Sequence, residues 1–129
     1  MLGFRKKTTG KRKVLIIDDD EFTLTLMQQL LQEDGYDIYS TADGPQGIAI
    51  FKQRRPDVVL LDLGLPSMNG LEVLRRIRSI DDSAKVIVIT GHASDESAEV
   101  ALLYGALEYV RKPVDPQSLL QLLKSSIPG

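Results

Sequence analysis

Five polar residues of this sequence carry the functional groups that a phosphoryl-transfer site needs, although they lie far apart in the chain. They are three carboxylates, a hydroxyl and an amine: Asp18, Asp19, Asp62, Thr90 and Lys112. A carboxylate can accept a phosphoryl group, and a metal ion, a lysine and a hydroxyl can neutralise the charge on its oxygens. Clustered carboxylates repel one another, by roughly 4 kcal/mol at about 4 Å near a protein surface. Such a cluster needs a cation, and Mg²⁺ suits it because Mg²⁺ takes oxygen ligands and keeps several waters.

These residues are placed by an alternation of apolar runs and helical patterns. Short apolar runs indicate strands buried on both faces, and a half-polar run indicates an edge strand. Caps, prolines and glycines mark the helix ends. We predict strands over 14–17, 36–40, 57–61, 85–89 and 107–111. Helices are predicted over 21–33 and 43–55, around Leu71, Leu74 and Ile77, from Ser94 to Gly105, and from Asp115 onward, with Leu119, Leu120, Leu122 and Leu123 buried.

Five strands alternating with five helices predict an α/β fold, in which helices cover both faces of a parallel sheet. Right-handed crossovers leave few topologies. In such folds a ligand binds beyond the carboxyl ends of the strands, where the strand order reverses. The three aspartates and Thr90 stand where predicted strands end, and Lys112 follows the last strand. We therefore expect all five side chains to meet at one mouth of the sheet.

Length and charge restrict the class of protein. The chain has 129 residues, enough for one domain, and no cysteine, which excludes disulfides and thiol chemistry. Six of the 16 basic residues fall in residues 1–13, which contain no acid; the remaining ten face 18 acidic residues. We expect residues 1–12 to form a basic, flexible arm and the acidic body not to bind DNA directly. The sequence has no signal-peptide core and no membrane span, so we expect a cytoplasmic protein.

Four segments at predicted strand ends form a specific set when taken in order, although each motif alone is weak. They are 15–20 (LIIDDD), 58–62 (VVLLD) with Pro66 and Gly70 after it, 88–91 (VITG) and 109–113 (YVRKP). Together they resemble the CheY-like receiver domain of bacterial two-component response regulators, over about residues 13–127. The resemblance implies a flavodoxin-like (βα)5 fold with a parallel sheet in the order 2-1-3-4-5. It also implies a phosphorelay switch that is not an enzyme, because it promotes only its own phosphorylation and dephosphorylation.

The resemblance implies a role for each site residue. Asp62 is the phosphoacceptor, and Asp18, Asp19 and Asp62 hold Mg²⁺ together with the backbone carbonyl of Gly64.

Four further residues complete the implied machinery. Lys112 pairs with the phosphoryl group, and the Thr90 hydroxyl forms a hydrogen bond to it. Tyr109 is the aromatic residue that changes rotamer, and Pro113 follows a cis peptide bond from Lys112.

The same resemblance implies partners. The phosphodonor is a sensor histidine kinase or a histidine phosphotransfer protein. No further domain follows the last predicted helix, so we expect a downstream effector in trans, or a longer protein of which this chain is a piece. A second copy of the chain is one candidate partner of the phosphorylated form.

The sequence departs from the usual receiver pattern at two positions. Val114 stands where a phenylalanine often follows Lys-Pro, which we expect to change packing more than chemistry. Gly64 has no side chain that could shield an acyl phosphate. His92, the only histidine, is expected in an exposed loop and not in a metal site.

Two other interpretations compete with a phosphorylated receiver. In a small phosphatase of the haloacid dehalogenase type, Asp18 would be the nucleophile, Asp20 the acid–base partner, and Asp62 would have no role. The chain lacks that family's cap and late acidic motif, and Phe22 replaces the expected Thr or Val. In a receiver-like interaction module, no residue would be phosphorylated. The position of a phosphate label separates the three.

Overall fold

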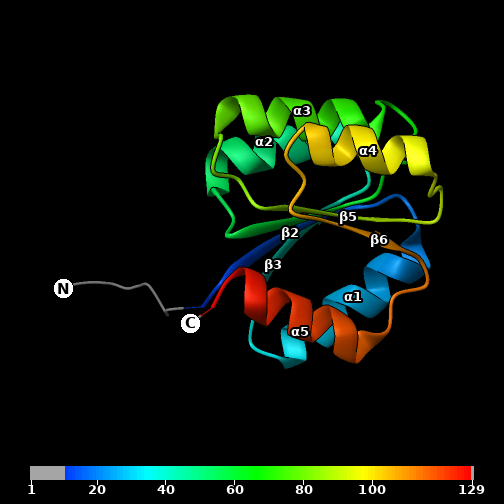
Figure 1. Ribbon diagram of the computed structural model, residues 1–129. Coiled ribbons are helices and arrows are strands. Elements are labelled where there is room, and N and C mark those ends of the chain that lie inside the picture. The colour runs from blue at the N-terminus through cyan, green and yellow to red at the C-terminus, as the bar shows by residue number, and fades with distance from the viewer. Residues whose placement is uncertain (1–10, 129) are drawn as a thin grey trace.

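Strands and helices alternate strictly in the computed structural model, which describes residues 11–128 (Figure 1). Of the predicted basic arm, only Lys11 and Arg12 are therefore described. The strands are β2 (Lys13–Ile17), β3 (Asp37–Thr41), β4 (Val58–Leu61), β5 (Val86–Thr90) and β6 (Glu108–Arg111). The helices are α1 (Glu21–Glu33), α2 (Gly44–Arg54), α3 (Gly70–Ile80), α4 (Asp95–Leu103) and α5 (Pro116–Ser126).

The strands form one parallel sheet in the order β3-β2-β4-β5-β6, so β3 and β6 are its edges. Counted along the chain this is the order 2-1-3-4-5, which confirms the predicted flavodoxin-like topology. The order reverses between β2 and β4, because the chain moves to one side of β2 first and to the other side afterwards. Ile17 pairs with Leu61 there, so the residues that follow each strand come out side by side.

Each face of the sheet is covered by its own helices, which is why the central strands β2, β4 and β5 are apolar at every position except Lys13 and Thr90. Alternate strand residues such as Leu15 and Val59 pack with α2, α3 and α4, while Ile16 and Leu60 pack with α1 and α5. Figure 1 shows these two helix layers above and below the sheet. Among residues 11–128, none of the helices combines the length and the apolar character that a membrane crossing requires.

Two helices bury less of their apolar surface than their sequences predict. In α5 only Leu119 and Leu123 are buried, and the prediction that Leu120 and Leu122 are buried is wrong, because both are only partly covered. Residues four apart point the same way on a helix, so one flat sheet covers a single narrow stripe. In α1 the covered stripe is Met27 and Leu31, which leaves other apolar side chains of that helix facing solvent.

Side-chain caps fix the start of four helices. A side-chain oxygen accepts a hydrogen bond from a backbone N–H of the first turn, which has no partner within the helix. The capping residues are Asp43 for α2, Asn69 for α3, Ser94 for α4 and Asp115 for α5. The predicted cap at Ser94 is thus confirmed, and Gly105 follows the end of α4 with φ of +96°, a backbone conformation that favours glycine.

The start of α3 lies directly against the loop that follows β4. Gly70 N donates to the Leu63 carbonyl at 3.1 Å. A Cβ atom at residue 70 would lie 2.4 Å from Leu63 Cα and 2.8 Å from the Asp62 carbonyl oxygen. Only glycine therefore lets α3 approach closely enough to hold the backbone on both sides of Leu63.

We predict that Gly70→Ala destabilises the protein by about 1–3 kcal/mol, because backbone atoms must move to admit the methyl group. Denaturant-induced unfolding measures the change. Gly91→Ala is the matched control, since a Cβ there would meet only Lys112 Cδ, at 3.9 Å. Equal stability of the two variants would show that the close approach of α3 is not constrained.

Candidate functional site

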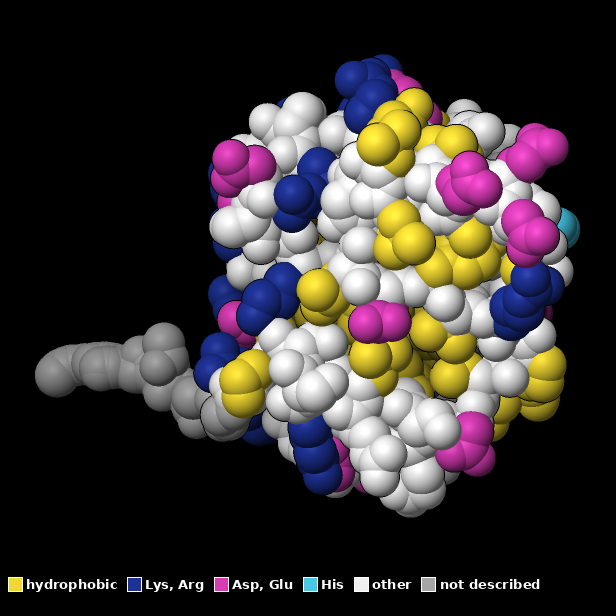
Figure 2. Space-filling view, viewed as in Figure 1, with side chains coloured by type: hydrophobic (Ala, Val, Ile, Leu, Met, Phe, Trp, Pro, Cys, Tyr) yellow, Lys and Arg dark blue, Asp and Glu magenta, His cyan; other side chains and the backbone are white. Residues whose placement is uncertain are grey.

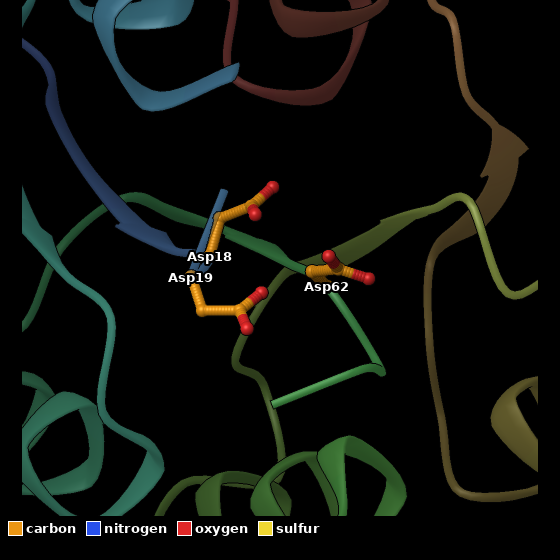
Figure 3. A group of neighbouring side chains, drawn as sticks. All are labelled: Asp18, Asp19 and Asp62. Atoms are coloured by element: carbon orange, nitrogen blue, oxygen red, sulfur yellow. The ribbon is translucent and has the colours of Figure 1, made fainter. Parts of the chain in front are cut away.

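Three carboxylates meet at the point where the strand order reverses. Asp18 and Asp19 follow β2 and Asp62 follows β4, and each offers a carboxylate oxygen within 4.8 Å of the other two (Figure 3). Asp18 and Asp62 are 2% and 4% exposed, whereas Asp19 faces solvent. Figure 3 shows the Asp19 side chain extending toward Asp62. Three oxygen donors with one open side form a set that could hold a hard divalent cation.

Backbone hydrogen bonds hold the two buried aspartates in place. Asp62 N donates to the Ile17 carbonyl at 2.9 Å, which continues the ladder between β2 and β4 beyond their last residues. Each carboxylate then accepts from the chain just after it: Asp18 from Asp20 N at 2.9 Å, and Asp62 from Gly64 N at 3.2 Å. The loops therefore orient the side chains as well as connecting the elements.

Lys112 bridges the two buried carboxylates, as expected from its position after the last strand. Its Nζ lies 2.9 Å from Asp18 Oδ2 and 3.1 Å from Asp62 Oδ2, and its side chain is 17% exposed. Lys112 N donates to the Thr90 carbonyl at 2.9 Å, and the predicted cis bond to Pro113 is present. One cation thus partly balances two negative charges that the topology brings together.

Burial and hydrogen bonding affect the two carboxylates differently. Burial raises the pKa of Asp18, because its hydrogen bond from Lys112 offsets only part of the lost solvation. Burial also opposes the charge of Asp62, but hydrogen bonds to Thr90, Gly64 N and Lys112 outweigh it and lower the pKa of Asp62. Burial opposes the Lys112 charge too, yet the two carboxylates raise the pKa of Lys112. Asp62 is therefore more firmly ionised than Asp18.

Thr90 belongs to the site and Tyr109 lies away from the carboxylates. The Thr90 side chain is completely buried, is a hydrogen-bond partner of Asp62, and accepts from His92 N at 3.0 Å. Tyr109, two strands from Asp62, is half-buried and places its hydroxyl 2.5 Å from Ser97 Oγ at the start of α4. Thr90 thus connects the carboxylates to β5, and Tyr109 connects the next strand to α4.

His92 is next to the site in a way that its sequence context did not predict. It is exposed, as expected, but its imidazole occupies the space beside Gly64. A Cβ at residue 64 would lie 2.4 Å from His92 Cδ2 and 2.6 Å from Nε2. The sequence carries one signal for this contact. Gly64 comes two residues after Asp62, and His92 comes two residues after Thr90. The strands that precede them, β4 and β5, are neighbours in the sheet. The imidazole therefore fills the place of the side chain that residue 64 lacks.

Comparisons with known proteins agree with this geometry. The family model for the response regulator receiver domain matches residues 14–124. Sporulation initiation phosphotransferase F of Bacillus subtilis is 33% identical over 90% of this chain and 94% of its own length. Chemotaxis protein CheY of Treponema pallidum is 35% identical over 94% of this chain and 86% of its own length. The solved CheX–CheY–BeF3–Mg²⁺ complex from Borrelia burgdorferi matches with a TM-score of 0.84 and 33% identity, over 91% of this chain and 90% of that chain.

Replacing Lys112 by methionine should leave Asp18 and Asp62 buried without their shared cation. We expect Lys112→Met to lower the free energy of unfolding by about 3 kcal/mol, as for a broken buried ion pair. The loss should shrink as the pH falls toward about 4. Without the lysine, burial and mutual repulsion raise both carboxyl pKa values in the folded state, so protonation then favours folding.

Denaturant unfolding at several pH values measures this loss. Lys124→Met is the matched control, because Lys124 is exposed in the last turn of α5. A loss of the same size in both variants would contradict the bridging role of Lys112.

Proposed function

Since the chain belongs to the response regulator receiver domain family, we propose that residues 13–127 form a phosphorylation switch whose phosphoacceptor is Asp62. Receiver domains are signalling switches of two-component systems and not conventional enzymes. One observation carries the assignment to Asp62: this ionised carboxylate directly follows β4 at the reversal of strand order, 3.1 Å from the Lys112 ammonium. An incoming phosphoryl group would thus find a nucleophile and a counter-charge together.

The transfer proposed here exchanges one bond for another. A carboxylate oxygen of Asp62 forms the new O–P bond while the N–P bond of the donor's phosphohistidine breaks, and that bonding pair returns to the donor's imidazole nitrogen. Lys112 pairs with the phosphoryl oxygens, and the Thr90 hydroxyl donates a hydrogen bond to them. Both residues already contact Asp62, so little rearrangement is needed to meet the charge that develops.

The carboxylate cluster fits Mg²⁺ as the cation of this switch. Asp18, Asp19 and Asp62 would hold the ion through carboxylate oxygens, and the Gly64 carbonyl would be a further ligand. The oxygen-only donor set and the exposed side at Asp19 suit an ion that keeps waters. Bound there, Mg²⁺ would neutralise charge on the phosphoryl oxygens.

The phosphodonor, a sensor histidine kinase or a histidine phosphotransfer protein, is proposed to dock over α1. An apolar groove of about 410 Å³ lies between α1 and α5, and Asp20 and Lys112 line the end of it nearest the site. Phe22 and Leu26 on its α1 side are 71% and 52% exposed. Apolar side chains exposed beside the site give a partner helix a surface to cover. We place this exchange in the cytoplasm, where phosphoryl groups derived from ATP are available.

The signal is proposed to leave through the face formed by α4, β6 and α5. Figure 2 shows apolar side chains gathered on this face, and Leu103 of α4 is 81% exposed. Phosphorylation would draw the Thr90 hydroxyl toward the new oxygens, and Tyr109 would turn into the space behind it, because an unfilled void loses packing energy. A downstream effector in trans, or a second copy of the chain, would then recognise the changed surface. We do not expect the acidic body of this domain to bind DNA directly.

The phosphatase interpretation receives less support from the geometry. Asp20, its acid–base partner for Asp18, is exposed, and its carboxylate accepts from Thr23 Oγ1 at 2.5 Å on the first turn of α1. Asp62, which would have no role, is in the buried cluster instead.

Acetyl phosphate should label the wild-type chain on Asp62 alone. Asp62→Asn should abolish the acid-labile, hydroxylamine-sensitive phosphate, because an amide oxygen cannot form the acyl phosphate. Asp20→Asn, an equal change in an exposed acid nearby, should label normally. Full labelling of Asp62→Asn, or a label that maps to Asp18, would refute the assignment; no label at all would favour the unphosphorylated interaction module.

Mg²⁺ should raise the stability of the wild-type chain and not that of Asp19→Ala. At about ten times the dissociation constant, linkage to a single site gives about 1.4 kcal/mol. Without Mg²⁺ the variant should be at least as stable as wild type, because it carries one fewer repelling charge. Thermal unfolding with and without MgCl₂ measures both effects, and Asp20→Ala is the control. Equal Mg²⁺ stabilisation of Asp19→Ala and wild type would count against the three-carboxylate site.

A further inference from the structure

The hydroxyl of Tyr109 takes part in the cap of α4. Ser94 and Ser97 form a capping box: Ser97 N donates to Ser94 Oγ at 3.1 Å, and Ser94 N donates to Ser97 Oγ at 3.3 Å. The Tyr109 hydroxyl comes from β6 and lies 2.5 Å from Ser97 Oγ and 3.3 Å from Ser94 N. Ser94 N–H is therefore shared between Ser97 and Tyr109, so a strand residue completes the cap of a helix.

This cap matters more for α4 than a similar cap matters for α5. The nine-residue helix α4 has Ala101 as its one buried residue, whereas α5 buries Leu119 and Leu123. A short helix with little buried surface depends on having its first N–H groups satisfied. In α5 the equivalent serine, Ser118, donates to Asp115 Oδ2 at 3.1 Å within its own first turn. Ser118 thus has the same position in its helix, and its hydroxyl bonds within its own first turn, whereas Ser97 adds the contact with Tyr109 to its local bonds with Ser94.

We propose that Ser97 is a positioning residue that couples the conformation of Tyr109 to the first turn of α4. In one position of the ring, its hydroxyl satisfies Ser97 Oγ and shares Ser94 N–H; when the ring leaves that position, both contacts are lost together. The two states of the ring therefore differ in how well α4 is capped. A ligand that favours one state shifts the population toward it, and the helix start follows.

The inference rests on the proposed function, because it supplies the step between Asp62 and the surface. Thr90, the hydrogen-bond partner of Asp62, ends β5, and β6 lies beside that strand, with Tyr109 paired to Val88. A change at Thr90 thus reaches the Tyr109 ring across one strand spacing, and the ring reaches Ser97 directly. The hydroxyl groups of Tyr109 and Ser97 therefore join the residue proposed to change rotamer, Tyr109, to the exposed face of α4.

A double-mutant cycle on the full chain tests the coupling. Tyr109→Phe removes only the hydroxyl, and Ser97→Ala removes its partner. The measured quantity is the affinity for beryllofluoride with Mg²⁺, a mimic of the acyl phosphate, followed by NMR shifts of the α4 first-turn amides. Each variant should change this affinity about fivefold in the same direction, the factor that one ordinary hydrogen bond gives. The double variant should change it no further than either single variant.

Two controls separate coupling from a simple loss of helix stability. Ser118→Ala removes the equivalent hydroxyl from α5, so it should leave the beryllofluoride affinity at the wild-type value. Ser97→Thr keeps the hydroxyl and should restore that value. Independent effects that multiply in the double variant, or a Ser97→Ala affinity equal to that of Ser118→Ala, would overturn the role of Ser97.

Labelling by acetyl phosphate is measured on every variant in parallel. If Asp62 is labelled normally throughout while the effects multiply, only the inference about Ser97 fails. If the wild-type chain itself takes no label on Asp62, the proposed function fails.

Discussion

The ammonium of Lys112 lies 2.9 Å from Asp18 and 3.1 Å from Asp62. This contact allows the strand ends that carry the two aspartates to lie next to each other. Because Ile17 pairs with Leu61, the residues that follow them, Asp18 and Asp62, must lie side by side, and both are buried. Two buried carboxylates so close together would otherwise be protonated or drive the strand ends apart. The lysine comes from beyond β6, so the chain must pass the end of β5 to deliver it, and its backbone bond to Thr90 fixes that path. Charge balance at the reversal point thus joins three strand ends into one site.

Much of the fold was predictable because its signals are local. Runs such as Val58–Leu61 are apolar at each position, as a strand covered on both faces must be, and the residue after such a run lies at the carboxyl edge of the sheet. Position along the chain therefore placed Asp18, Asp62 and Thr90 at one mouth without any knowledge of side-chain conformation. Helix ends were predictable for the same reason, since the Ser94 cap and the turn at Gly105 depend on neighbouring residues.

The features that were not predicted depend on how separate loops meet. The imidazole of His92 lies beside Gly64 because the loops after β4 and β5 come together, and neither loop's sequence records the other's conformation. The pairing of Tyr109 with Ser97 is a rotamer-level contact between a strand and a helix. Helical periodicity identified the apolar stripe of each helix but not how much of that stripe the sheet covers. It therefore did not show that Phe22 is exposed. Val114 is partly buried against the part of the core that includes α1 and α5. Its side chain, which is smaller than phenylalanine, lines the groove between these two helices.

The two edges of the sheet differ in character from its centre. The central strands β2, β4 and β5 are almost wholly buried, whereas β3 and β6 show a mixture of covered and exposed positions. Both edges are short and begin with an acidic residue, Asp37 in β3 and Glu108 in β6, and Arg111 ends β6. Short, charged edge strands are poor templates for pairing with strands of other chains. The most β-prone segments of the sequence are thus shielded from neighbouring molecules, so the native protein should resist edge-to-edge aggregation even at high concentration.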